Sequence, residues 1–342
     1  MSPKVVLGLA LVTVLTVVVA VVVVLSEPGT GRIEFDDRPA FPELRADPDA
    51  VGEIVIETAD QEVRLRRQDE GGWIAETAYG YPASSGRIRG LVTALADMRL
   101  IEPKTANPER FGRLQVEDVE REGATSRLVR LADGDGGVLA DVLIGKARNR
   151  LTGTEPAGTY IRFADEEQSW LASGRIELPA EPALWLERRV VDLAGDEVVS
   201  ISVEPPDGEA YTLAREDEGW ILDDGSAEMA GDQDPGELSG ALEALEHQGV
   251  RPAAEVAWPE VAWRFRFTTE KGLEVAVRLA EVEGEPWAQL EASTNLTDDG
   301  QEAVERAAAI SARTEGWAYR LPDPLSQRLR QPRSAWLDDG TS

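Results

Sequence analysis

The sequence predicts an α+β protein in which an N-terminal transmembrane helix precedes two tandem related units, each an antiparallel β meander packed with an amphipathic helix. Three observations lead to this prediction: a long uncharged apolar run, short alternating segments between glycine-rich turns, and a strand–turn–helix order that occurs twice. The expected boundaries are a transmembrane anchor over 1–26, a juxtamembrane linker over 27–50, a first unit over 51–195, a second unit over 196–325 and a tail over 326–342.

The apolar run covers residues 5–25, "VVLGLALVTVLTVVVAVVVVL", and contains no charged residue. As a helix it would be about 31 Å long, which matches the hydrocarbon thickness of a bilayer. A cleaved signal peptide, whose apolar region is usually about 7–15 residues long, and a buried core helix are the alternatives. Lys4 precedes the run and Arg32 and Arg38 follow it, so positive charge hardly distinguishes the two orientations. A short tail ahead of a strongly acidic domain favours a single-pass protein of the cytoplasmic (inner) membrane with an extracytoplasmic, periplasmic domain.

The first unit follows a linker that is rich in Pro, Gly and Asp. Residues 53–57 ("EIVIE") and the segment "EVRLRR" alternate as strands do, "QDEGG" is the expected turn, and "WIAE" starts the next strand. A helix comes next, with Ser85 as its expected cap and Pro103 as the residue that prevents its continuation. Its apolar stripe consists of Ile88, Leu91, Val92, Leu95 and Met98.

The second unit repeats this order. "SISVE" and "YTLAR" are expected strands, "EDEG" is the turn, and "WIL" resumes the sheet. Asp234 and Pro235, with Glu237 nearby, then form a helix start, and the expected stripe is Leu238, Leu242 and Leu245. Ile54 and Ile201, Trp73 and Trp220, Leu91 and Leu238, Leu95 and Leu242, and Met98 and Leu245 are all separated by 147 positions. A single offset across strands, turn and helix indicates an internal duplication.

β-rich sequence follows each helix. In the first unit it consists of "SRLVRLAD", "VLADVLIG" and "GTYIRFAD", and in the second of "WRFRFTT", "LEVAVRLAEV" and "PWAQLEA". Tight turns between these segments predict antiparallel meanders. Residues 302–313 are expected to form a last amphipathic helix before "GWAYRLPDPLSQRL".

Composition excludes several classes of function. The 342 residues include no Cys and a single His, His247, so disulfides, thiolate nucleophiles and zinc sites built on Cys or clustered His are excluded. The net charge of −29 would repel nucleic acid. We find no glycine pattern for a nucleotide and no nucleophile elbow. We therefore expect a non-enzymatic protein with no catalytic, cofactor-binding or metal-binding residues and no cofactor.

Four acidic segments have a functional and a structural interpretation. Asp69 with Glu70, and Asp217 with Glu218, could act as paired carboxylates, but acidic residues before glycine are also what a hairpin turn favours. Residues 132–137 and 231–237 resemble fragments of calcium loops without the full spacing. We favour the structural interpretation for all of them.

Other candidates are weighed in the same way. His247 is expected to face solvent or to cap a helix rather than act as a base. "Asn295-Leu296-Thr297" is a glycosylation triplet of a kind that is common by chance. Arg188 and Arg189 could pair with nearby carboxylates and tie the two units together, or dock an acidic partner. The tryptophans that could line a carbohydrate groove, but are expected to pack in the core, are Trp73, Trp170, Trp185, Trp220 and Trp317.

Several phrases together resemble the bacterial domain of unknown function 4340 family: "GGWIAETAYGYPASSGRIRGLVTALADMRLIEP", "ERFGRL", "VLIGKA", "GTYIRF", "WLASG" and "WLERRVVDL". The sequence departs from the family at Arg113, where leucine is typical, and its second unit lacks the Tyr-Pro-Ala phrase. The positions that carry the resemblance are Trp73, Tyr81, Pro82, Ala83, Phe111, Gly112, Gly145, Tyr160, Trp185 and Arg188. The resemblance implies membrane-anchored proteins of unknown activity, often encoded beside ABC-transporter components similar to those of gliding-type systems, and it carries over no catalytic residue.

These expectations combine into a membrane-anchored accessory protein of an ABC-type transport or envelope assembly. Its partners would be the membrane, through residues 5–25, and the membrane or ATPase-associated subunits of a transporter. The alternative is an extracytoplasmic module that binds glycan or solute through Trp residues between the two units.

Overall fold

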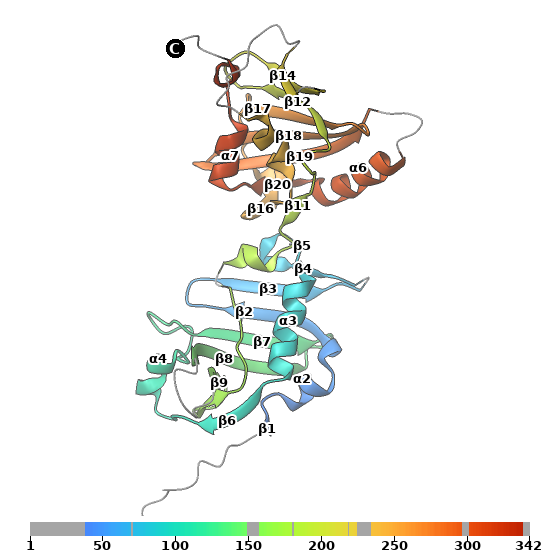
Figure 1. Cartoon of the computed structure of the whole chain (residues 1–342). Helices are drawn as coiled ribbons and strands as arrows, with labels where there is room; N and C mark the ends of the chain where they lie inside the picture. Colours follow the sequence, from blue (N-terminus) through green and yellow to red (C-terminus); the bar gives the residue numbers. More distant parts are fainter. Residues whose placement is uncertain are drawn as a thin grey trace, which may run out of the picture.

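Two large antiparallel sheets, with short helices packed on them, make up the computed structural model (Figure 1). The α+β class expected from the sequence is confirmed in this form. The sheets lie in two lobes, one after the other along the chain. The structure describes residues 38–69, 71–148, 157–179, 181–217, 219–223, 234–295 and 301–337.

Sheet 1 has ten strands in the order β1-β6-β10-β9-β8-β7-β2-β3-β4-β5. Helix α3 (Ser85–Ala96) runs across one face of it (Figure 1) and buries Ile88, Leu91, Val92 and Leu95 of the predicted stripe. Met98, the fifth residue of that stripe, is buried just beyond the end of the helix. The strands are β1 (Arg38–Pro39), β2 (Val51–Glu57), β3 (Glu62–Arg67), β4 (Trp73–Ala75), β5 (Tyr81–Pro82), β6 (Arg99–Pro103), β7 (Arg127–Asp133), β8 (Val138–Arg148), β9 (Gly158–Phe163) and β10 (Ser169–Ala172). The short helical segments beside them are α2 (Pro42–Ala46), η1 (Pro48–Ala50), η2 (Glu76–Ala78), η3 (Pro108–Arg110) and α4 (Phe111–Leu114).

Sheet 2 has eight strands in the order β14-β13-β12-β17-β18-β19-β20-β16. The expected last helix is present as α6 (Gln301–Thr314), which packs on β18 and β19. The strands are β12 (Val198–Glu204), β13 (Tyr211–Glu216), β14 (Gly219–Leu222), β16 (Gly249–Pro252), β17 (Trp263–Thr269), β18 (Leu273–Val282), β19 (Glu285–Thr294) and β20 (Trp317–Arg320). The remaining elements are η4 (Pro182–Trp185), β11 (Arg189–Val191), α5 (Pro235–Ser239), η5 (Gly240–Leu242), β15 (Leu245–Glu246), η6 (Ala253–Glu255), α7 (Asp323–Leu329) and η7 (Arg333–Trp336).

Eight strands follow the same order in both sheets. Sheet 1 reads β4-β3-β2-β7-β8-β9-β10-β6 and sheet 2 reads β14-β13-β12-β17-β18-β19-β20-β16. A β-bulge interrupts the register between Val51 and Glu53, and another lies between Val198 and Ser200. These two sites are again 147 positions apart. The turns expected at "QDEGG" and "EDEG" each connect two antiparallel strands, one pair in each sheet. Arg67 pairs with Trp73 across the first turn, and Arg215 pairs with Trp220 across the second.

The helix of the second unit is shorter than the sequence predicted. Asp234 caps it as expected by accepting a hydrogen bond from the Gly236 amide, but α5 ends at Ser239 and Leu245 lies in strand β15. Leu245 is nevertheless buried, because β15 pairs with β11 in a small separate sheet. In the first unit the expected cap, Ser85, is already the first helical residue, and Ser84 occupies the cap position.

Part of the segment expected as a linker belongs to the first lobe. Within 38–50, strand β1 pairs with β6, and α2 inserts Leu44 into the core with no exposed surface. Phe41 packs edge-on against Phe163, with ring centroids 5.6 Å apart. The Pro and Asp content of this segment suggested a linker. Its few apolar side chains instead pack into the core of the first lobe, so 38–50 is part of that lobe.

Residues 326–337 are likewise folded where a tail was expected. Trp336 is 3% exposed, and its indole nitrogen donates to the Tyr211 hydroxyl at 3.0 Å. The segment around η7 therefore covers sheet 2. In the part of the chain that the structure describes, no helix combines the length and the apolar character that a membrane crossing needs. The span expected at 5–25 lies outside the described residues.

Candidate functional site

The two lobes are joined by a connecting segment, residues 182–193, that pairs with both of them. At its start, the Ser84 amide donates to the Trp185 carbonyl at 2.8 Å, and the Glu187 amide donates to the Pro82 carbonyl at 2.9 Å. At its end, β11 pairs with β15, and the Leu193 amide donates to the Leu242 carbonyl at 3.0 Å. The segment thus belongs to the edge of sheet 1 and then to the second lobe.

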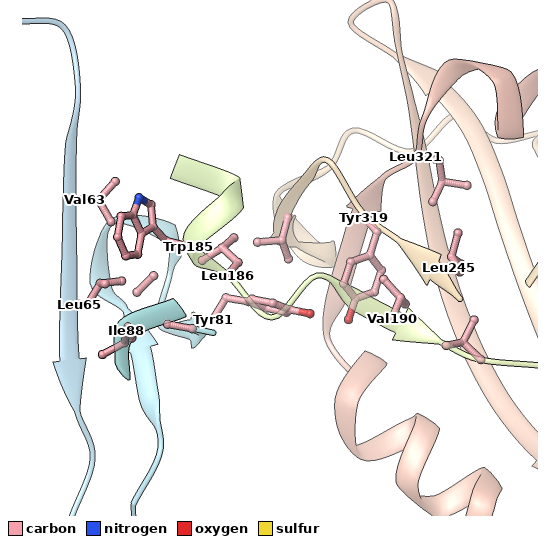
Figure 2. Close-up of a cluster of buried hydrophobic side chains, with 14 of the residues drawn as sticks. Val63, Leu65, Tyr81, Ile88, Trp185, Leu186, Val190, Leu245, Tyr319 and Leu321 are labelled. Carbon is pink, nitrogen blue, oxygen red and sulfur yellow. The ribbon is translucent and has the colours of Figure 1, made fainter. Parts of the chain in front are cut away.

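A cluster of aromatic rings fills the junction beside this segment. Tyr81 comes from β5 of sheet 1 and Tyr319 from β20 of sheet 2 (Figure 2). Trp317 also lies in β20, and His247 follows β15. Tyr81 stands edge-on to Trp317, with centroids 5.0 Å apart, and edge-on to His247, with centroids 5.4 Å apart. Such edge-to-face pairs are each worth about 0.5–1.5 kcal/mol beyond the area they bury. The cluster and the fully buried Trp185 make the hydrophobic core continuous between the lobes.

His247 is fully buried and follows strand β15, so the expectation that it faces solvent or caps a helix is wrong. Its Nε2 lies 3.2 Å from the Glu187 carbonyl oxygen and its amide donates to the Arg188 carbonyl, while no hydrogen-bond partner lies near Nδ1. Burial lowers the pKa of His247 to about 4, with a smaller lowering effect from the positive charge of Arg188. The ring is therefore neutral at pH 7 and donates through Nε2.

The two tyrosines of the cluster differ in their hydrogen bonds. The Tyr319 hydroxyl donates to the Arg313 carbonyl at 3.0 Å, whereas the buried Tyr81 hydroxyl meets no hydrogen-bond partner. Burial raises the pKa of both phenols above the ordinary value of 10.0. All three titratable groups of the cluster are thus uncharged at neutral pH, which suits a packed junction.

Arg188 and Arg189 do pair with carboxylates, as one interpretation of the sequence expected. Arg188 lies 3.1 Å from Glu246 of β15 and so links the connecting segment to the second lobe. Arg189 pairs within its own segment, with Asp192 at 2.8 Å. A third cation, Arg313 of α6, donates to the Val190 carbonyl at 3.2 Å. These contacts reinforce the same junction.

The tryptophans do not form an open groove. Trp185 is fully buried, and Trp73, Trp170, Trp220 and Trp317 are half-buried and pack against the core. None of the nine Trp side chains in the described residues is exposed. Trp73 and Trp220 lie just after the turns of the matching β3–β4 and β13–β14 hairpins, where each pairs with an arginine of the preceding strand.

The acidic candidates that fall in the described residues act as turn and cap residues. Asp133 Oδ1 accepts hydrogen bonds from the Asp135 and Gly137 amides, at 2.9 and 2.7 Å. Asp69 and Asp217 are exposed. Glu70, Glu218, residues 231–233 and the Leu296 and Thr297 of the glycosylation triplet lie outside the described residues. Across the described ranges, no three His, Asp or Glu side chains are grouped so that they could hold a metal ion.

The positions that carried the family resemblance gather in two places. Tyr81, Pro82 and Ala83 meet Trp185 and the following Leu186 at the junction, where Ala83 bridges to Leu186.

The second place lies farther along sheet 1. A Cβ at Gly145 would lie 2.2 Å from the Leu114 carbonyl oxygen, so glycine is required where α4 crosses β8. Phe111 of α4 lies under the Arg162 guanidinium, 4.7 Å from ring centroid to Cζ. These short motifs are therefore packing contacts.

Sequence reasoning missed Tyr319 and the role of Tyr81 as its partner. The segment "WAYR" follows the last expected helix and was given no strand, yet Trp317–Arg320 is a strand of sheet 2. Its two aromatic residues, Trp317 and Tyr319, stand two positions apart and favour a strand, which is the signal that could have identified it.

A family model described as "Domain of unknown function (DUF4340)" matches residues 73–257 of the chain. The matched range starts at the Trp of the first hairpin, includes the whole connecting segment and ends after β16. It therefore contains Tyr81, Trp185 and His247 of the junction. Neither a curated protein nor a solved structure matches the chain.

Proposed function

The chain belongs to the DUF4340 family, and we propose that it is a non-enzymatic, membrane-anchored accessory protein of an ABC-type transport or envelope assembly. The observation that carries the proposal is the uncharged run at residues 5–25, which precedes the two lobes that the structure describes from Arg38 onward. Such a run has the length of a bilayer-spanning helix. Anchored in this way, the folded part would lie on the extracytoplasmic side of the cytoplasmic membrane.

The position of the first described strand supports this arrangement. β1 lies at the edge of sheet 1 that is remote from the second lobe (Figure 1). Residues 26–37 can reach at most about 40 Å, so an anchored chain would hold sheet 1 near the bilayer and present sheet 2 farther out. The packed junction would keep sheet 2 at a fixed distance and orientation, which is useful in a docking protein.

We also infer that the two lobes are related units produced by duplication. The matching order of eight strands and the bulges 147 positions apart support this inference. The family match is one continuous range that ends inside the second lobe, so it does not divide into one match for each lobe.

The decisive experiment is co-purification of the tagged full chain from a mild detergent. Specific recovery of ABC-type membrane or ATPase subunits is the expected result. The matched control is residues 1–37 with the same tag, which recovers only what the apolar run itself retains. If the full chain recovers no transporter subunit beyond this control, the assignment to a transporter is lost.

The orientation has a separate test. A C-terminal alkaline phosphatase fusion should be active and a C-terminal green fluorescent protein fusion should be dark, because each reports which side of the membrane it reaches. The opposite pattern would place the domain in the cytoplasm.

Glycan binding through exposed tryptophans is the less favoured candidate. Stacking on a sugar needs an accessible indole face, and no described Trp side chain is exposed.

A further inference from the structure

The open face of sheet 2 carries a hollow of about 290 Å³ ringed by arginines. Two rows of side chains cross the strands here. One row consists of Glu204, Arg264, Arg278 and Gln289, and the next consists of Ser202, Arg266, Ala276 and Glu291. The hollow lies over Ala276, whose methyl group is surrounded by longer side chains.

Sheet 1 provides an internal comparison for this site. Ile54 of β2 pairs with Leu131 and Ile201 of β12 pairs with Phe267, so Arg130 and Arg266 occupy the same place in the two registers. Arg130 lies opposite Asp141 and donates two hydrogen bonds to its Oδ2, at 3.0 and 2.9 Å. Arg266 lies opposite Ala276 instead. The carboxylate that neutralises the arginine in sheet 1 is thus replaced by a hollow in sheet 2.

The neighbouring row makes the difference larger. Leu128 pairs with Leu143 in sheet 1, whereas the corresponding positions in sheet 2 are Arg264 and Arg278, directly opposite each other. Like charges at such positions destabilise a sheet. Their contacts in the folded chain are limited: Arg264 lies 4.0 Å from Glu204, and Arg278 donates to the Pro259 carbonyl at 3.0 Å.

Arg266 has one distant carboxylate, Glu274 at 4.0 Å. Arg278 lies over Trp258, 4.8 Å from the ring centroid, and its buried Nε has no hydrogen-bond partner. In a chain of net charge −29, three guanidinium groups therefore surround one hollow with incomplete neutralisation. An anionic group in the hollow would relieve their mutual repulsion.

We propose that this hollow binds an aspartate or glutamate side chain from an acidic segment of a partner protein, in the place that Asp141 takes beside Arg130. The partner's carboxylate accepts hydrogen bonds from Arg266 and from the arginine pair. Gln289 and Ser202 at the rim offer further hydrogen bonds to the partner's backbone. This deepens the proposed function, and it rests on that function in taking the occupant to be a protein.

Exposure argues for a protein rather than a free metabolite. The Arg264 and Arg266 side chains are 57% and 60% exposed, so the hollow by itself cannot enclose a small molecule, whereas a docked protein covers the surrounding sheet face. Glu204 and Glu291 flank the site and disfavour nucleic acid, whose adjacent phosphates would lie beside them. A single carboxylate leaves both glutamates free to pair with the neighbouring arginines.

The test uses the full chain in detergent micelles and two fluorescein-labelled peptides, (Glu-Thr)₅ and (Gln-Thr)₅, at about 0.15 M salt, where distant charges are screened. Fluorescence anisotropy should show saturable binding of the Glu peptide and binding at least about tenfold weaker for the Gln peptide. Ala276→Asp, which restores the pairing seen in sheet 1, and Arg266→Gln should each weaken binding of the Glu peptide by about tenfold or more. Arg130→Gln is the matched control and should change it by less than about twofold.

Three results would overturn the proposal: no saturable binding of the Glu peptide, unchanged binding to Ala276→Asp, or competition by inorganic phosphate as effective as unlabelled Glu peptide, which would indicate a general anion site. Ala276→Asp adds an ion pair on an exposed face, so it is expected to fold, and its melting temperature should equal or exceed that of the parent. Peptide binding does not require a transporter. If the Glu peptide does not bind but transporter subunits are recovered with the full chain, this inference alone is lost. If the Glu peptide binds but no transporter subunit is recovered, the transporter assignment is lost.

Discussion

The Tyr81 ring of sheet 1 stands perpendicular to the His247 ring of the second lobe, with an interplanar angle of 89° and centroids 5.4 Å apart. Neither side chain is more than 1% exposed. Two residues 166 positions apart in the sequence therefore meet in one buried contact, and burial keeps both of them uncharged at neutral pH.

Acid should destabilise the protein through His247. Because burial lowers its folded pKa to about 4 from an ordinary 6.5, the unfolded chain binds more protons between these values. The contribution to stability is complete above about pH 6.5 and is lost as the pH falls towards 4, by at most about 3 kcal/mol. Urea unfolding at pH 7 and at pH 4.5 should show this loss.

The control for this titration is His247→Gln, which keeps a donor but has no ionisable ring. The difference in the free energy of unfolding between parent and variant should shrink as the pH falls. Only the parent has an imidazole that binds a proton in the unfolded chain and stays neutral in the folded one, so only the parent loses stability by this route. A difference that is constant with pH would mean that other groups dominate the acid response.

The two tyrosine hydroxyls of the junction should respond differently to removal. Tyr319→Phe leaves the Arg313 carbonyl without its donor and should cost about 1 kcal/mol in the free energy of unfolding. Tyr81→Phe removes a buried hydroxyl that meets no partner, so it should be neutral or slightly stabilising. Equilibrium unfolding of the two variants compares them directly, and equal costs would contradict the hydrogen-bond assignment.

Trp185 should be the most important single anchor of the connecting segment. It is fully buried, so Trp185→Ala should destabilise the chain by about 3–5 kcal/mol. Trp220→Ala removes a half-buried ring that lies under Arg215 and should cost only about 1–2 kcal/mol. Similar costs in thermal unfolding would show that the connecting segment is not part of the shared core.

Gly145 should tolerate no side chain. In Gly145→Ala the new methyl carbon would lie 2.2 Å from the Leu114 carbonyl oxygen, and the backbone would have to move, at a cost of about 1–3 kcal/mol or more. Gly90→Ala is the matched control, because Gly90 is exposed in α3 with no atom near its added methyl group. That change should stabilise the helix by up to about 1 kcal/mol. Both are measured as shifts in the unfolding midpoint.

Local patterns predicted most of the secondary structure. The strands at 263–269 and 273–282 match the alternating segments found in the sequence, and the helix at 85–96 buries its predicted stripe. Such patterns succeed because one buried face imposes a period on the residues of a single element. The second-unit helix failed because Leu238, Leu242 and Leu245 keep the same spacing whether a helix continues or gives way to a strand.

The sequence by itself determined the α+β class, the hairpin turns, the repeated order of elements and the absence of cysteine chemistry, because each depends on neighbouring residues or on composition. Only the tertiary structure decided that His247 is buried and that 38–50 and 326–336 belong to the folded lobes. It alone set Arg266 opposite Ala276 while Arg130 faces Asp141. Strand register brings together side chains that are distant in the chain, and no local periodicity records which residue will lie across from which.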